Sequence, residues 1–146
     1  MRYLAFALAL VGAALTAQAQ TATPDLRGTW KGAGKSIIYG NNPHHSGSET
    51  LASPPRIQDF EFTFVIDGQD GRLVWGHSFS KAAATNEPFA WAITADGKTI
   101  MGADTDGYYN MSVQSPDRME MCYAHAGVSP TKSIVAVCFM IDRQKK

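Results

Sequence analysis

The sequence predicts an all-β protein, a single-domain antiparallel eight-stranded up-and-down barrel. Two observations lead to this prediction. No stretch after residue 19 shows helical periodicity of useful length, and short runs of alternating apolar and polar residues recur between Gly, Asp and Pro turn signals. Such runs are typical of antiparallel sandwiches and barrels. Eight strands are expected, at residues 28–39, 60–66, 73–80, 89–94, 99–103, 108–113, 119–125 and 133–141.

The first nineteen residues have the pattern of a signal peptide. Arg2 gives a positive start, an uncharged apolar run follows, and Ala17-Gln18-Ala19 has the small-x-small pattern of a cleavage site. The apolar run is shorter than the roughly twenty residues that span a bilayer, and the alternative is an N-terminal membrane anchor. We expect residues 1–19 to be a cleaved signal peptide and residues 20–146 to form the barrel domain. The expected location is periplasmic or secreted, with no stable membrane insertion after cleavage.

The charge pattern and the motifs narrow the range of partners. Lys and Arg (13) balance Asp and Glu (13), and no basic block precedes the C-terminal residues 143–146. A nucleic-acid partner is not expected, because it requires a basic face. The chain has neither a phosphate loop nor a dinucleotide-binding fingerprint, so no cofactor is expected.

The two cysteines, Cys122 and Cys138, both follow the predicted signal peptide. In an oxidising compartment an isolated pair is a disulfide candidate. The two positions have the register of a hairpin centred near Pro130, so we expect them to pair on adjacent strands. Cys122 shares its face with Glu120, which is expected to point outward, and this predicts a bridge on the barrel exterior. A two-cysteine metal site and a catalytic thiol are the alternatives.

The connections between the runs are asymmetric. Three connections, at residues 67–71, 95–98 and 114–117, have tight-turn chemistry, and in an up-and-down meander they fall at one end. The other end receives the connections 40–59, 81–88, 104–107 and 126–132. Because binding residues concentrate on loops, this looped end is the expected position of a pocket.

Alternation along each run assigns the barrel faces. The expected inward side chains are Trp30, Gly32, Gly34, Ser36 and Ile38; Phe60, Phe62, Phe64 and Ile66; Leu73, Trp75, His77 and Phe79; Phe89, Trp91 and Ile93; and Met119, Met121, Tyr123 and His125. This interior is densely aromatic. It predicts either a pocket for an apolar or flat ligand or a filled core, because an eight-stranded barrel has limited room.

The four histidines are predicted to gather at the looped end. His44 and His45 lie in the first long loop, while His77 and His125 lie late on inward-facing runs. One hypothesis is a metal or acid–base cluster, with oxygen ligands from Glu87, Asp104 and Asp106. The alternative is that His77 and His125 cap the core by hydrogen bonds. No metal-ligand spacing is present, so no metal is assigned. The stretch Asp104-Thr105-Asp106-Gly107 mimics part of a calcium loop but is expected to be a hairpin turn.

The first run begins Gly28-Thr29-Trp30. A Gly-x-Trp on the first strand of an eight-stranded meander resembles the calycin group, which includes lipocalins and avidins. The resemblance implies a calycin-type barrel in which Trp30 plugs the closed end, and the loop 40–59 resembles the lipocalin lid. Arg143 is the counterpart of the lipocalin Arg near the last strand. Ser36 falls where avidins have a ligand-binding Ser, but Gly32 replaces the avidin Asn, which argues against biotin.

The leading functional hypothesis is the binding of one small, mostly apolar or aromatic molecule at the looped end. The predicted ligand-binding residues are His77, His125, Tyr123, Trp75, Phe79, Trp91, Ser36, His44 and His45. One alternative is a small barrel enzyme (a cyclase, isomerase or hydrolase) with His77 or His125 as general base and Tyr123 or Asp104 assisting. Another is a secreted protein-interaction or inhibitor module that uses the loops.

Overall fold

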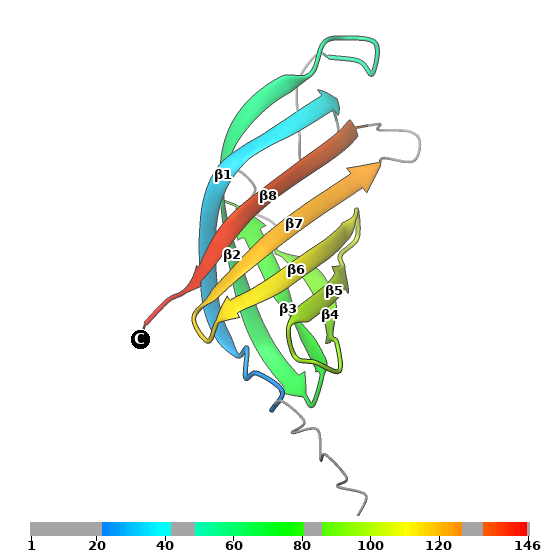
Figure 1. The fold of residues 1–146 in the computed structure, drawn as a ribbon. Helices are drawn as coiled ribbons and strands as arrows, with labels where there is room; N and C mark the ends of the chain where they lie inside the picture. The colour runs from blue at the N-terminus through cyan, green and yellow to red at the C-terminus, as the bar shows by residue number, and fades with distance from the viewer. Residues whose placement is uncertain (1–21, 42–48, 81–85, 127–132, 146) are drawn as a thin grey trace, which may run out of the picture.

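Eight antiparallel strands close into one barrel in chain order, as the computed structural model shows (Figure 1). The structure describes residues 22–41, 49–80, 86–126 and 133–145. The strands are β1 (Gly28–Gly40), β2 (Arg56–Asp70), β3 (Leu73–Ser80), β4 (Glu87–Ile93), β5 (Thr99–Ala103), β6 (Tyr108–Ser115), β7 (Arg118–Ala126) and β8 (Ser133–Arg143). The predicted all-β fold, an antiparallel eight-stranded up-and-down barrel, is confirmed. No helix in these residues is long and apolar enough to cross a membrane.

The connection between β4 and β5 shows how local sequence closes a hairpin. Gly97 has a φ of 71°, a left-handed conformation that glycine adopts without steric cost. Asp96 Oδ1 accepts hydrogen bonds from the Thr94 hydroxyl (2.6 Å) and the Lys98 amide (3.0 Å). The Asp-Gly turn signal therefore acts here as predicted.

β2 is longer at both ends than predicted. It already pairs with β1 at Arg56, opposite Ile38, so the predicted loop 40–59 ends before that residue. At the other end the strand continues to Asp70, through residues predicted as a turn, because a bulge lies between Ile66 and Gly68. A bulge inserts one extra residue and shifts the side-chain alternation of its strand.

The face predicted for β3 is wrong. Leu73, Trp75, His77 and Phe79 point away from the core, and Val74, Gly76 and Ser78 are the buried positions. The inward positions of β3 are small because their neighbours are large: a Cβ on Gly76 would lie 2.7 Å from the Phe89 ring. Small and large residues alternate between neighbouring strands so that the interior is filled. Trp75 instead packs on the outer wall, where a Cβ on Gly68 would overlap its indole.

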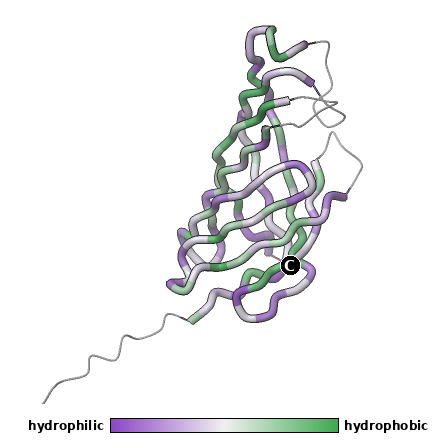
Figure 2. The backbone as a smooth tube through the Cα atoms, turned by 90° about the vertical axis from the view of Figure 1, so that its right-hand side faces the viewer, coloured by the Kyte–Doolittle hydropathy of each residue, from purple (hydrophilic) through white to green (hydrophobic). Residues whose placement is uncertain are grey.

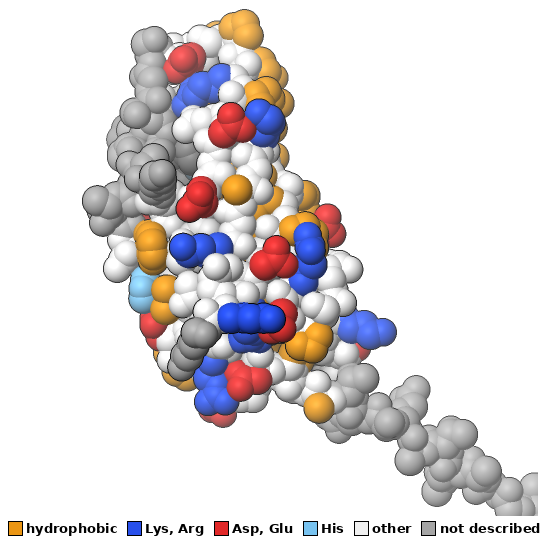
Figure 3. All heavy atoms as spheres, turned by 90° about the vertical axis from the view of Figure 1, so that its left-hand side faces the viewer, with side chains coloured by type: hydrophobic (Ala, Val, Ile, Leu, Met, Phe, Trp, Pro, Cys, Tyr) orange, Lys and Arg blue, Asp and Glu red, His pale blue; other side chains and the backbone are white. Residues whose placement is uncertain are grey.

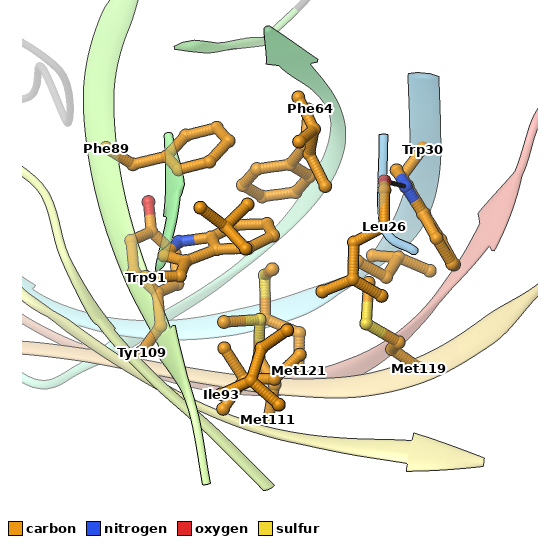
Figure 4. Packing of buried hydrophobic residues seen from close by; sticks show 14 of the residues in the cluster. Leu26, Trp30, Phe64, Phe89, Trp91, Ile93, Tyr109, Met111, Met119 and Met121 are labelled. Carbon is orange, nitrogen blue, oxygen red and sulfur yellow. Dashed lines mark hydrogen bonds between the residues drawn. The ribbon is translucent and has the colours of Figure 1, made fainter. Parts of the chain in front are cut away.

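The other assigned faces are confirmed. Phe64, Ile66, Phe89, Trp91, Ile93, Met119 and Met121 belong to one buried core cluster. Apolar and polar residues alternate along the strands, as a half-buried sheet requires (Figure 2). Figure 4 shows the Leu26 side chain beside Trp30 and Met119, so residues before β1 help to fill the closed end.

Cys122 and Cys138 are paired on β7 and β8 and form a disulfide, as predicted. Their positions alternate with the buried Met121 and Phe139, which places the bridge on the barrel exterior. On the face seen in Figure 3, acidic and basic side chains are interspersed. Some opposite charges on the outer wall form ion pairs, for example Lys35 with Asp59 at 2.8 Å.

Candidate ligand cavity

A cavity of about 590 Å³ opens at the looped end of the barrel. Its walls come from β1, β2, β3, β4, β6, β7 and β8 and from the connection between β5 and β6. Most lining side chains are apolar or aromatic: Ile38, Phe60, Phe62, Phe64, Phe79, Tyr109, Met121, Tyr123, Val135, Val137 and Phe139. The closed half below is filled by the buried core cluster. The aromatic residues therefore form a packed core in the closed half of the barrel and the lining of a pocket in the open half.

The aromatic walls are ordered by ring contacts. Phe60 meets Phe139 edge-on with ring centroids 4.7 Å apart, and Phe62 stacks on Phe64 at 5.9 Å. Tyr109 and Tyr123, paired on β6 and β7, have centroids 4.8 Å apart. These separations are those of favourable aromatic pairs. A flat ligand would therefore meet preformed ring surfaces on both sides of the cavity.

The cavity is lined by a group of polar residues, Ser78 on β3, Asp104 between β5 and β6, Tyr109 on β6 and Tyr123 on β7, which we call the Asp104 cluster. The Tyr109 hydroxyl donates to Asp104 Oδ2 (2.5 Å), and the Tyr123 hydroxyl donates to Asp104 Oδ1 (3.3 Å). The same Oδ1 accepts from the backbone amides of Asp106 (2.9 Å) and Gly107 (2.7 Å). Asp104 therefore closes the β5–β6 hairpin, as predicted for this stretch, while its carboxylate lines the cavity.

Gly107 brings this hairpin close to β7. A Cβ at this position would lie 2.7 Å from both Tyr123 Oη and the His125 Cβ, and 2.6 Å from the Ala124 carbonyl oxygen. Any larger residue would push the turn away, because contacts this short do not occur between real atoms. The glycine thus permits Asp104 and Tyr123 to meet.

The tyrosines of the cluster are held in the neutral form. Burial, followed by the negative charge of Asp104, raises the pKa of Tyr109 far above its usual value. Burial also raises the pKa of Tyr123, with further contributions from the charges of Asp104, Asp106 and Glu87. Three carboxylates thus act on one hydroxyl.

Ser78 is the member of the cluster that no protein atom satisfies. Its side chain is 0 % exposed, lines the cavity, and has no hydrogen-bond partner for Oγ. Ser78 acts to lower the pKa of Tyr109, against the larger effects of burial and of Asp104. A buried polar atom without a partner costs free energy, and such atoms often mark a site that a ligand or water completes.

His125 lies within the barrel wall behind the cluster. It is 4 % exposed, with its Nε2 2.7 Å from Ser133 Oγ and its Nδ1 3.5 Å from the Tyr123 hydroxyl. Because Tyr123 gives its single proton to Asp104, the contact with His125 requires Nδ1 to donate. This arrangement matches the predicted hydrogen-bonding histidine rather than a base facing the cavity.

His77 does not join His125, which corrects the predicted histidine cluster. It lies on the outer wall, where its Nδ1 is 2.8 Å from Asp67 Oδ2 at the β2 bulge. His44 and His45 lie outside the described residues. Over the described ranges, no group of three or more His, Cys, Asp or Glu side chains is arranged to hold a metal ion.

Some of the remaining predicted ligand residues line the cavity, and others do not. Ser36, Phe79 and Tyr123 line the cavity, Phe79 from the rim. Trp91 is buried in the core below, and Trp75 is on the outer wall, 48 % exposed. Sequence reasoning placed Tyr123 on the inward face but did not name Ser78 or Tyr109 as ligand residues. The bulge between Ile66 and Gly68 shifts the β2–β3 register by one residue, so that Ser78 lies opposite the inward Phe64. A pairing without the bulge puts Phe79 there, and strict alternation therefore assigns Ser78 to the wrong face.

No protein-family model matches the chain, and no curated protein matches it. Among solved structures, the chain is similar to the S-type phycobiliprotein lyase CPES from Guillardia theta. The identity is 12%, the match covers 83% of this chain and 89% of that chain, and the TM-score is 0.32. The function of this chain is therefore inferred from its own side chains.

Proposed function

We propose that this chain is an exported carrier that binds one small, mostly apolar or aromatic molecule in the cavity at the looped end. The observation that carries this proposal is the cavity of about 590 Å³ with its aromatic lining. Ligand pockets typically measure roughly 300–1,000 Å³ and combine apolar walls with a few polar groups. The Asp104 cluster supplies such groups.

The proposal includes export. Residues 1–19 have the pattern of a cleaved signal peptide, so the working domain is residues 20–146 and its location is periplasmic or secreted. The Cys122–Cys138 disulfide supports this location, because disulfides persist in oxidising compartments. The mixed charge of the outer wall supports the absence of a nucleic-acid partner, and the exported domain would not insert stably into a membrane.

Fluorescence titration with N-phenyl-1-naphthylamine, an apolar aromatic probe that brightens on leaving water, tests this function. The probe should bind saturably at one site per chain. Ser36→Phe places a ring in the cavity, because Ser36 is buried and lines it, and should weaken binding on the order of tenfold.

Ser112→Phe is the matched control, since Ser112 lies on β6 away from the cavity and shares a hydrogen bond with Gln114 on the surface. It should leave the affinity unchanged. Thermal unfolding establishes that both variants fold. Absence of saturable binding, or equal binding by the wild type and a folded Ser36→Phe variant, contradicts the proposal.

A further inference from the structure

The described charged residues that border the cavity are all acidic: Asp59, Glu61, Glu87, Asp104 and Asp106. Asp59 and Glu61 alternate with the inward Phe60 and Phe62, so their side chains lie on the outer wall. Asp59 is paired with Lys35 on the outer wall, at 2.8 Å. Asp104 is different, because its carboxylate lies among aromatic rings and its hydrogen-bond partners are hydroxyl and amide groups that carry no positive charge. Its negative charge is therefore not neutralised by a described Lys or Arg.

The acceptor capacity of Asp104 is also incomplete. A carboxylate offers about four lone-pair sites over two oxygens. Oδ1 accepts three contacts, whereas Oδ2 accepts one, from Tyr109. Ser78 Oγ, which is buried and without a partner, lines the same cavity. The cavity thus presents a charged acceptor and a second oxygen, both suited to an N–H donor.

The aromatic rings around Asp104 also favour a positively charged N–H donor. Tyr109 and Tyr123 flank Asp104, and the Phe side chains complete the walls. The faces of aromatic rings attract cations, and this attraction increases in a site removed from water. Carboxylates and ring faces together favour ammonium groups, while an anionic ligand would be repelled by the same carboxylates.

We propose that the cavity binds an arylalkyl amine in its cationic form, with the ammonium group at the Asp104 cluster and the aromatic body against the aromatic walls. This inference rests on the proposed carrier function and names the chemical class of its ligand. The ammonium N–H groups would donate to Asp104 Oδ2 and to Ser78 Oγ. The ligand would thereby satisfy the buried hydroxyl that the protein leaves without a partner.

Three probes with one ring system and different charge test this assignment by calorimetry at neutral pH: 1-naphthylmethylammonium, 1-naphthylmethanol and 1-naphthoate. A hydrogen bond to a charged group contributes roughly 1.5–3 kcal/mol, which corresponds to a preference of about tenfold or more for the cation over the neutral alcohol. The naphthoate should bind most weakly. A neutral probe that binds as tightly as the cation overturns the inference and leaves the carrier function standing. If none of the three probes binds, both fail.

Two variants test whether Asp104 causes the preference for the cation over the alcohol. Asp104→Asn removes the charge and should reduce the preference for the cation to less than about threefold while the alcohol keeps its affinity. Asp70→Asn is the matched control, because it makes the same change at an exposed position at the closed end of β2. It should leave the preference intact. Equal preference in the wild type and Asp104→Asn contradicts the assignment.

Asp104→Asn also alters the β5–β6 hairpin, so Ser78→Ala gives an independent result. Ser78 Oγ has no protein partner to lose, so this variant should fold at least as well as the wild type. It should weaken binding of the cation by several-fold and leave the alcohol unaffected. If Ser78→Ala changes neither affinity, the ammonium group does not bind at the Asp104 cluster and the proposed position is wrong.

Discussion

The guanidinium of Arg143 lies over the indole of Trp30, with its Cζ 4.3 Å from the ring centroid. The same group donates hydrogen bonds to the backbone carbonyls of Asp25, Arg27 and Pro116 and to the Asp117 carboxylate. One side chain thus connects the end of β8, the β6–β7 turn and the segment before β1. Trp30 is thus buried at the closed end, as expected, and Arg143 helps to seal the barrel at the end away from the cavity.

Trp30→Ala should strongly destabilise the fold. The indole is fully buried, and its Nε1 donates to the Leu26 carbonyl at 2.8 Å. Removing a buried Trp side chain costs about 3–5 kcal/mol, through lost burial and the cavity left behind. Chemical denaturation measures this loss in the free energy of unfolding. A variant that unfolds at the wild-type denaturant concentration would show that Trp30 is not part of the core.

Arg143→Lys should destabilise the closed end even though it keeps the charge. Lysine cannot reproduce the planar fork that reaches several carbonyl groups while it stacks on Trp30. We expect a loss of roughly 0.5–1.5 kcal/mol, the net range for a hydrogen bond, because the carbonyl groups concerned remain accessible to water. Lys31→Arg, at an exposed position of β1, is the control and should be neutral. Equal stabilities of Arg143→Lys and the wild type would contradict the role assigned to Arg143.

The Cys122–Cys138 bridge should stabilise the folded protein, because it closes a loop and so lowers the entropy of the unfolded chain. The two residues are 16 positions apart, and the chain-entropy estimate for such a loop is about 3 kcal/mol. The double variant Cys122→Ala/Cys138→Ala should lose about this much free energy of unfolding. Thiol titration of the denatured, unreduced wild type should find no free thiol, and two free thiols would contradict the disulfide.

The raised pKa values of Tyr109 and Tyr123 predict a loss of stability at alkaline pH. In the unfolded chain tyrosine ionises near its ordinary pKa of 10.0, whereas the folded protein holds both protons above that pH. The unfolded state therefore binds fewer protons above about pH 10, so stability is full below that pH and falls as pH rises. The slope is at most about 1.4 kcal/mol per pH unit for each tyrosine.

Phenolate absorbance and denaturant midpoints between about pH 9 and pH 11 measure this effect. The Tyr123→Phe variant lacks one of the two groups, so its stability should fall less steeply than that of the wild type. Two tyrosines should ionise together with unfolding rather than before it. If all phenolate absorbance appears while the protein remains folded, the two hydroxyls are not held neutral by the Asp104 cluster.

The architecture could be predicted because most strands show their own alternation of apolar and polar residues. On β7, Glu120 marks the outer face, which correctly assigns Met119, Met121 and His125 to the interior. β3 lacks such a marker, since both of its sides carry apolar residues. Its large residues were expected inside, but Gly76 and Ser78 face inward because the neighbouring Phe64 and Phe89 fill that space. Size complementarity between strands is not visible within one strand.

The site could be predicted only in part for a related reason. Tyr123 was assigned inward by alternation, and Asp104 was placed at the looped end by the strand order. Their hydrogen bond depends on the tight approach of Gly107 to β7, which is a tertiary contact between segments that are not consecutive. His77 was misplaced together with the face of its strand, and the predicted histidine cluster was wrong for this reason.

A crystal structure of the protein soaked with 2-bromonaphthalene tests the central claim most directly, because the bromine can be located by its anomalous scattering. The account predicts one strong bromine peak inside the barrel, between Tyr123 on β7 and Phe139 on β8, which both line the cavity. Peaks confined to the outer wall, such as against the exposed Trp75, with none inside the barrel, would contradict the claim that the looped end is a ligand site.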